Sequence, residues 1–434
     1  MGNRLRSIWQ GLNASYWFYP GLFALTALIL SVVTVELDRA GWAERLAAIA
    51  WLHPAQPDGA SNMLTVIAGS MIGVASTVFS ITIAAVVYAS GTYGPRLLTN
   101  FMENRGNQLS LATFIGTFVF SLGVLRTVRS DSENEIIGAF VPQLSLLVAY
   151  LLMALSIAVL VYFLNHIPAS IRINSVLQGI GERLIADIRT RFPHPASLAG
   201  TDDRSEGLAI TANDTGYVQQ IAFDALEQVG ASAGATIRLT VRAGDFVHGQ
   251  VPLVLWCNGG APGSDELARL RAAFTLGGMR TPAQDLHFLI DELVEIALRA
   301  LSPGINDPFT AITALHWLGA ATAELAARDL GEDSLADPDG RLRHVRLLGD
   351  DFAHYLQRGF GTMRSALATS PAAALVAFES MGYAAIASDN ARKVLIIEEG
   401  HRLLAQARTA LAGPDLAQVE QAYAGFAGRL SGTG

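Results

Sequence analysis

Four stretches of the chain carry no charged side chain and are long enough to cross a lipid bilayer. They cover residues 16–35, 63–88, 109–125 and 141–164. A membrane helix needs about 20 apolar residues, so each stretch predicts one span, the third at the short end of the range. Histidine is absent from these stretches as well. Because proton-coupled carriers usually place an ionisable group at membrane depth, this absence argues against such a transporter.

The charges are divided unevenly between the two parts of the chain. Residues 1–164 hold 8 Lys and Arg against 8 Asp and Glu, and residues 165–434 hold 22 against 30, so the second part carries the whole net charge of −8. A nucleic-acid binder would show a basic face instead. We expect four regions, namely a four-helix transmembrane domain at 1–170, an amphipathic helix and linker at 171–206, a small β module at 207–260 and a helical domain at 264–434.

Arginines near the ends of the spans predict the orientation. Eight fall on one side, namely Arg4, Arg6, Arg96, Arg105, Arg172, Arg183, Arg189 and Arg191, and four on the other, namely Arg39, Arg45, Arg126 and Arg129. Positive residues collect on the cytoplasmic side. We therefore expect a multi-pass protein of a bacterial inner membrane, with both termini and the second half of the chain in the cytoplasm.

The second stretch carries a stripe of small side chains on one helix face. Gly69, Gly73, Ser76 and Ser80 follow at spacings of four, three and four residues, and Thr77 flanks them. Such a stripe is typical of packing between membrane helices, where small residues let two backbones approach. It also suits the wall of a pore, because hydroxyls and backbone carbonyls can replace the water around an ion. Packing is the more common use, and both interpretations stay open here.

The second half of the chain mixes a short β region with a long helical one. An amphipathic helix is expected at 171–192, where apolar residues recur about every four positions. The segments GYVQQI, ATIRLTV and VPLVLW are rich in β-branched and aromatic residues and predict strands of a small sandwich or barrel-like module. Helices are expected at 264–275, 284–301, 308–328, 347–366, 371–388, 390–412 and 415–430. The predicted class is therefore a mainly α membrane protein.

The segment SPGINDP separates two of these helices. Gly304 can end the first helix in the left-handed conformation, Asp307 can cap the second, and Pro308 suits its first position. These structural roles account for the residue types. The alternative is a ligand or gating loop, in which Ser302, Asn306 and Asp307 present polar groups beside a helix N-terminus.

His287, Asp291 and Glu295 are spaced four apart on one predicted helix, as metal ligands can be. Arg299, however, is placed to pair with Glu295, and no second histidine lies nearby. We therefore expect no metal site, and a face of this helix that meets water.

The rare residues restrict the chemistry further. One cysteine, Cys257, excludes an intramolecular disulfide and a cysteine-based zinc or iron–sulfur site. The one lysine, Lys393, is not part of a glycine-rich phosphate loop. The zinc-protease motif H-E-x-x-H does not occur. We expect no catalytic residue and no cofactor, and a chain that is not an enzyme.

Several segments together resemble one family of predicted bacterial membrane proteins, the DUF2254 family. The resemblance rests on WFYP, AGSMIGVASTVFSITI, GPRLLTNF, TFIGTFVFSLGVLRTVR, FVPQLS, VYFLNHI, GDFV and above all RALSPGINDPFTA. It extends along the whole chain. The resemblance implies a four-span membrane domain followed by a cytoplasmic domain, and it implies no particular activity.

Two functions fit these observations. The first is an ion channel lined by the second span, which requires a homo-oligomer because four spans are too few to enclose a pore. Tyr93, Pro95 and Arg96, just beyond that span, are then candidates for a gate or vestibule. The second is a non-conducting sensor or scaffold whose cytoplasmic domain binds a ligand or a protein. The expected partners are membrane lipid, further copies of the chain and ions, and not nucleic acid.

Overall fold

The computed structural model describes residues 17–42, 56–94, 105–129, 140–195, 207–330, 344–348 and 351–431. The chain divides into two compact units, Met1–Arg172 and Ile173–Gly434. We call them the membrane unit and the second unit.

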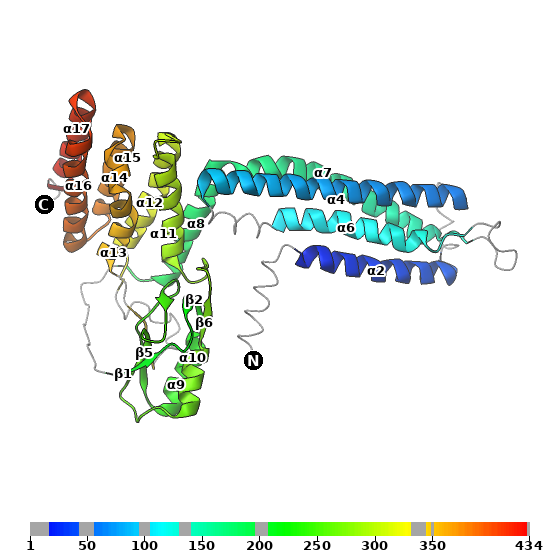
Figure 1. Ribbon diagram of the computed structural model, residues 1–434, viewed down its shortest axis with the longest axis horizontal. Coiled ribbons are helices and arrows are strands. Elements are labelled where there is room, and N and C mark those ends of the chain that lie inside the picture. The colour runs from blue at the N-terminus through cyan, green and yellow to red at the C-terminus, as the bar shows by residue number, and fades with distance from the viewer. Residues whose placement is uncertain are drawn as a thin grey trace. The chain divides into compact units, whose positions relative to one another are not determined.

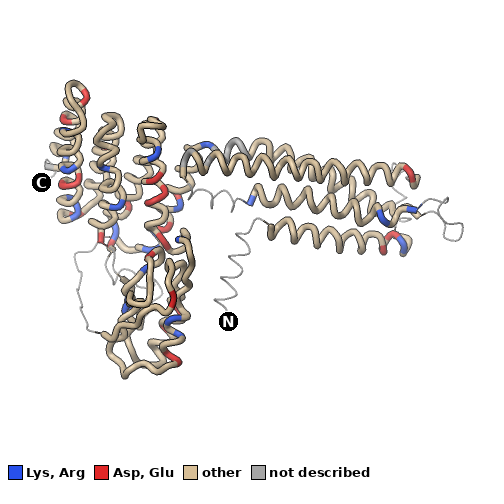
Figure 2. The backbone as a smooth tube through the Cα atoms, viewed as in Figure 1, with Lys and Arg blue, Asp and Glu red and all other residues tan. Residues whose placement is uncertain are grey.

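The described part of the membrane unit contains four helices that run side by side (Figure 1): α2 (Phe18–Arg39), α4 (Pro57–Tyr93), α6 (Arg105–Leu125) and α7 (Gln143–Ile171). All four are long and apolar enough to cross a membrane, which confirms the predicted number of spans. Figure 2 shows charged residues gathered at the ends of these helices. Helix α4 begins six residues before the predicted stretch, because Pro57 suits a first helical position although Asp58 follows it.

Helix α6 lies at the centre of the membrane unit and packs against the other three helices. Gly116 and Gly123 allow α2 to come close, since a Cβ at Gly123 would overlap the hydroxyl of Ser31. On the side facing α7, the hydroxyls of Thr117 and Ser156 are hydrogen-bonded at 2.9 Å. The core between the helices is mainly apolar, with Phe114, Phe120 and Phe163 among its fully buried side chains, and the polar side chains of Asn107, Gln108, Ser110 and Ser121 on α6 are buried as well.

Helix α7 receives its N-terminal cap from another helix. The residue before it is Pro142, which has no side-chain group that could cap. Asp38 of α2 takes this role, accepting hydrogen bonds from the backbone N–H groups of Leu144 (2.8 Å) and Ser145 (2.9 Å) and from the Ser145 hydroxyl (2.7 Å). The carboxylate satisfies N–H groups that a helix start leaves unpaired and ties the end of α2 to the start of α7.

The second unit begins with α8 (Ile173–Arg191), and its described residues include seven strands with two short helices between them. The strands are β1 (Leu208–Thr211), β2 (Gly216–Ile221), β3 (Thr236–Leu239), β4 (Phe246–Val247), β5 (Pro252–Cys257), β6 (Phe274–Gly277) and β7 (Val345–Arg346). They form a four-stranded sheet in the order β1-β5-β3-β7 and a three-stranded sheet in the order β4-β2-β6. All pairs are antiparallel except β3 with β7.

Both sheets contribute to one apolar core, together with α9 (Phe223–Ala233) and α10 (Ser264–Ala272). Helix α9 was not predicted from the sequence, nor was a strand at β6 or β7. Strands in the predicted module are thus confirmed, while its sandwich or barrel arrangement stays a prediction.

The rest of the second unit is helical, and its helices stack in a row (Figure 1). They are α11 (Leu286–Ala300), α12 (Pro308–Ala326), α13 (Phe352–Leu356), the π-helical turn η2 (Gln357–Gly361), α14 (Thr362–Ala368), α15 (Pro371–Ile386), α16 (Asn390–Ala410) and α17 (Gly413–Ser431). The helix predicted at 347–366 begins only at Phe352 and is interrupted by the π turn, which periodicity in the sequence does not reveal.

Candidate functional site

The small-residue stripe of α4 faces away from the other helices of the membrane unit. Its members Gly69, Gly73, Ser76, Thr77 and Ser80 are all exposed, and no atom lies within 4 Å of a Cβ placed on either glycine. The described side chains of α4 that are buried are those of Ala60, Leu64, Ile67, Ala68, Met71, Ala75, Val78, Thr82 and Val86. At about 100° per residue, the two sets lie on opposite sides of the helix. The stripe is therefore not a packing face for another described span of this chain.

The stripe hydroxyls bond to their own helix. Thr77 Oγ1 donates to the carbonyl of Gly73 at 3.0 Å, and Ser80 Oγ donates to the carbonyl of Ser76 at 2.9 Å. Each hydroxyl oxygen still has lone pairs available as acceptors. The face can therefore meet a helix, or water and cations, without leaving these donors unsatisfied.

The gate candidates fall at the edge of what the structure describes. Tyr93 is the last residue of α4, and Gly94 follows with a φ of 131° that favours glycine. Pro95 and Arg96 lie outside the described residues. Their role at a gate or vestibule stays a prediction.

In the loop between α11 and α12, the capping interpretation is confirmed for Asp307. Its carboxylate accepts hydrogen bonds from the Thr310 backbone N–H (3.2 Å) and hydroxyl (2.6 Å). The Ser302 hydroxyl donates to the carbonyl of Arg299 at 2.6 Å. The expectation for Gly304 was wrong, because the residue with positive φ is Asn306, at 50°. The side chains of Ser302 and Asp307 thus hold the loop together.

A cavity of about 520 Å³ opens inside the second unit. Its walls come from α8, from the ends of β2 and β3, from the start of α9, and from the segment that leads into α11. Apolar side chains such as Phe223 and Leu239 line it together with charged ones, among them Asp187, Asp224 and Arg191. Surrounding protein raises the pKa of Asp187, while the charge of Arg183 acts in the opposite direction. Mixed apolar and polar walls of this kind are typical of small-molecule sites.

Gln284 joins the three parts of the second unit that meet at this cavity. Its side-chain oxygen accepts a hydrogen bond from Ile221 N–H at 2.9 Å, and its amide nitrogen donates to the Ile221 carbonyl at 3.3 Å. Its own carbonyl accepts from Arg191 Nη1 at 3.3 Å. Its φ is 61°, an unusual value for a residue with a side chain. The backbone is held in this conformation where β2, α8 and α11 converge.

A network of ion pairs, in which arginine and aspartate side chains alternate, lies next to Gln284. Arg280 contacts Asp285 at 2.7 Å and Asp291 at 2.6 Å, and Arg358 contacts Asp291 at 2.7 Å. Burial raises the pKa of Asp285 despite its pairing with Arg280. Burial by itself would also raise the pKa of Asp291, but the hydrogen bonds and charges of Arg358 and Arg280 bring it below its usual value. Gly244 leaves room for the network, since a Cβ there would overlap the Asp285 carboxylate.

His287 was expected to face water, and that expectation was wrong. The residue is 6% exposed, and its ring stacks on Tyr355 with centroids 5.1 Å apart. Burial, and after it the positive charge of Arg358, lowers the pKa of His287 to about 2, so the ring is neutral at ordinary pH. Asp291 is also paired rather than solvated. The predicted pair of Arg299 with Glu295 is present, at 3.9 Å.

Sequence reasoning missed both the cavity and the charge network. The network joins residues up to 67 positions apart, and no periodic pattern reports such a contact. The sequence contained one pointer to this region, namely the GDFV and Gln284-Asp285 segments. The structure brings these two segments together at Gly244 and Asp285.

The comparisons with known proteins agree with the membrane architecture. A family model described as "Predicted membrane protein (DUF2254)" matches residues 13–382. An uncharacterized protein of Mycobacterium bovis and one of Mycobacterium tuberculosis are each 32% identical to this chain over 382 residues, covering 84% of it and 70% of each relative. No solved structure gives a significant match. The chain therefore belongs to the DUF2254 family of predicted membrane proteins.

Proposed function

We propose that this protein is a homo-oligomeric channel of the bacterial inner membrane whose pore is lined by α4. The observation that carries the proposal is the exposed stripe of Gly69, Gly73, Ser76, Thr77 and Ser80 on a spanning helix. Small residues in membrane helices are characteristic of surfaces that approach another helix or line a path. Since no described span of this chain covers the stripe, the covering surface comes from further copies of the chain.

In a cyclic assembly the stripe of α4 faces the symmetry axis. One α4 per subunit around a symmetry axis brings the stripes together at the centre. Small side chains leave space there, and the oxygens of Thr77 and Ser80 and nearby backbone carbonyls offer partial negative charge to a passing cation. Residues 63–88 of α4 carry no charged side chain, so conduction in this proposal relies on these dipoles.

We place the second unit in the cytoplasm, together with both termini. The support is the excess of arginines on one side of the spans, eight against four. In this arrangement the partners are lipid, further copies of the chain and the conducted ions. The proposal includes no catalytic step.

Ion flux through purified protein in liposomes tests the channel. Ser76→Leu and Ser80→Leu fill the stripe and are expected to abolish flux from an intact oligomer. Thr26→Leu is the matched control, because Thr26 is also exposed on a span and its hydroxyl bonds to the carbonyl four residues earlier. Absence of flux from the wild-type oligomer, or equal loss in all three variants, would contradict the proposal.

A second candidate function is a non-conducting sensor, and the cavity at Gln284 favours it. A ligand there would contact α8, which follows the last span after the single residue Arg172. Thermal unfolding of the full chain against a panel of small amphipathic amines and carboxylates tests this function. Thr190→Trp fills the cavity and should remove any stabilisation, whereas Gln178→Trp on the exposed surface of α8 should not.

A further inference from the structure

Helices α8 and α12 lie parallel and in a constant register. A Cβ at Gly181 would overlap the ring of Trp317, Arg189 pairs with Glu324 at 3.1 Å, and Arg328 Nη1 donates to the carbonyl of Phe192 at 2.5 Å. These pairs are 136, 135 and 136 residues apart in sequence. Because the difference in residue number is constant, each residue of α8 lies beside the residue of α12 that comes about 136 positions later.

The same register places the first residue of α8 beside the start of α12. Ile173 plus 136 positions is Phe309, the second residue of α12. Ile173 is separated from Ile171, the last residue of α7, by Arg172 alone. Packed helices have axes about 8–10 Å apart. The Phe309 end of α12 is therefore about one helix-packing distance from Ile173, the residue that follows the last spanning helix after Arg172 alone.

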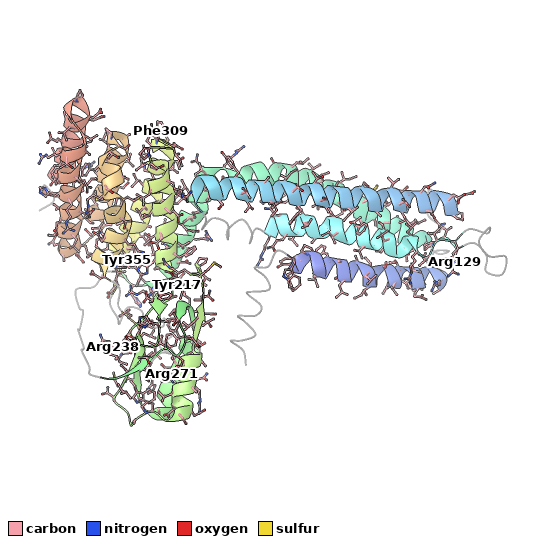
Figure 3. The ribbon with its side chains drawn as sticks, viewed as in Figure 1. Arg129, Tyr217, Arg238, Arg271, Phe309 and Tyr355 are labelled. Carbon is pink, nitrogen blue, oxygen red and sulfur yellow. The ribbon has the colours of Figure 1, made fainter. Side chains whose placement is uncertain are left out.

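Large apolar side chains are exposed at this end. Phe309 is 77% exposed and Ile305 is 44% exposed. Figure 3 shows Phe309 at the end of the α11–α12 hairpin, away from Tyr355. The turn from Leu301 to Asn306 carries no charged residue, and the carboxylate of Asp307 is engaged by Thr310. Two exposed apolar side chains on an uncharged turn form a surface that water does not favour.

We propose that the turn between α11 and α12 inserts Ile305 and Phe309 into the lipid interface. Aromatic side chains favour this zone, where an apolar ring meets acyl chains and headgroups. Arg172 is exposed at the neighbouring helix start and is available to lipid phosphates. The lipid is the occupant because Ile173, which the constant register places level with Phe309, follows the last spanning helix after Arg172 alone. This contact gives the second unit a second attachment to the bilayer, a role independent of conduction.

Spin labels on the full chain in lipid nanodiscs test the proposal. Cys257 is buried and is first replaced, as Cys257→Ser. Single cysteines for labelling are then introduced as Phe309→Cys and Ile305→Cys, positions whose exposure makes them tolerant of change. Ile386→Cys is the matched control. Ile386 is 69% exposed and ends α15, just before α16, where Arg392 Nη1 donates to the carbonyl of Ala326 at the far end of α12.

The measured quantity is collision of each label with oxygen, which enters lipid, against collision with a water-soluble nickel chelate. We expect the ratio of oxygen to nickel collisions to be several-fold higher at 305 and 309 than at 386. Equal, water-like ratios at all three positions would overturn the proposal. Protection of 305 and 309 from both reagents, or dipolar broadening between labels of neighbouring copies, would also overturn it, because protein would then cover the turn.

Discussion

Gly116 and Gly123 on α6 lie against α2, whereas Gly69 and Gly73 on α4 have no neighbour within 4 Å. Both pairs sit on spanning helices. The two helices differ in how much of their surface other helices of the chain cover. In the apolar part of α6, 56% of the residues are buried, against 28% in that of α4. Small residues thus indicate that a close neighbour is needed but not whether the same chain supplies it. On α6 the neighbour is internal, and on α4 we infer that it is another copy.

The largest effect is expected from Gly123→Leu. The new side chain would overlap Ser31, whose own Cβ lies 2.8 Å from the position of a Cβ at Gly123. Overpacking of a close helix contact costs about 1–3 kcal/mol, and leucine here lies at the upper end of that range. We expect a large fall in the thermal unfolding midpoint of the detergent-solubilised chain. An unchanged midpoint would show that α2 does not approach α6 as described.

A smaller loss is expected from Asp38→Ala. The substitution leaves the N–H groups of Leu144 and Ser145 without their cap, which costs about 1–2 kcal/mol. Asp38→Asn keeps one acceptor oxygen and should lose less. The measurement is again the unfolding midpoint. If both variants unfold like the wild type, the link between α2 and α7 does not stabilise the membrane unit.

Acid sensitivity should distinguish the second unit from the spans. The pKa of His287 is 6.5 when unfolded and about 2 when folded, so its contribution to stability is fully present above pH 6.5 and is lost as pH falls toward 2. The slope is at most about 1.4 kcal/mol per pH unit. Asp285, whose pKa is raised, changes stability in the opposite direction.

His287→Phe tests this assignment, because it keeps a ring against Tyr355 and removes the titrating group. The unfolding midpoint of this variant should depend less on pH between 7 and 5 than that of the wild type. An identical pH dependence would mean that His287 is not the buried neutral group described here.

The smallest effect on stability is expected from Gly69→Leu. With open space around the glycine, the change in monomer stability should stay within about 0.5 kcal/mol. The mass of the detergent-solubilised particle should nevertheless fall, because leucine blocks the approach of a second copy. A stability loss as large as that of Gly123→Leu would remove the distinction between the two glycine pairs.

The spans could be predicted from the sequence because each is a local property. An uncharged run of sufficient length fixes a membrane helix, and four such runs correspond to α2, α4, α6 and α7. The cap of α12 at Asp307 was also predictable, since aspartate directly before a proline is typical of a helix start. Helix α9 was missed although its buried Leu226, Val229 and Gly230 recur at helical spacing, because strand-like segments on both sides led to the whole region being interpreted as β.

The candidate site was predicted only in part. The spacing of Gly69, Gly73, Ser76 and Ser80 placed them on one face, but the direction of that face depends on which side of α4 the helix α6 occupies. The contact of Asp38 with Ser145 spans 107 residues, and that of Arg358 with Asp291 spans 67. Such pairs form when distant segments pack, and no local pattern contains them.

The most direct test of the central claim is block of ion flux by a thiol reagent at the α4 stripe. In a Cys257→Ser background, Ser76→Cys and Thr26→Cys are compared in liposomes before and after treatment with a charged methanethiosulfonate. The account predicts that flux through Ser76→Cys falls sharply and that flux through Thr26→Cys is unchanged. Flux that persists in the treated Ser76→Cys protein, with labelling confirmed by mass, would contradict a pore lined by α4.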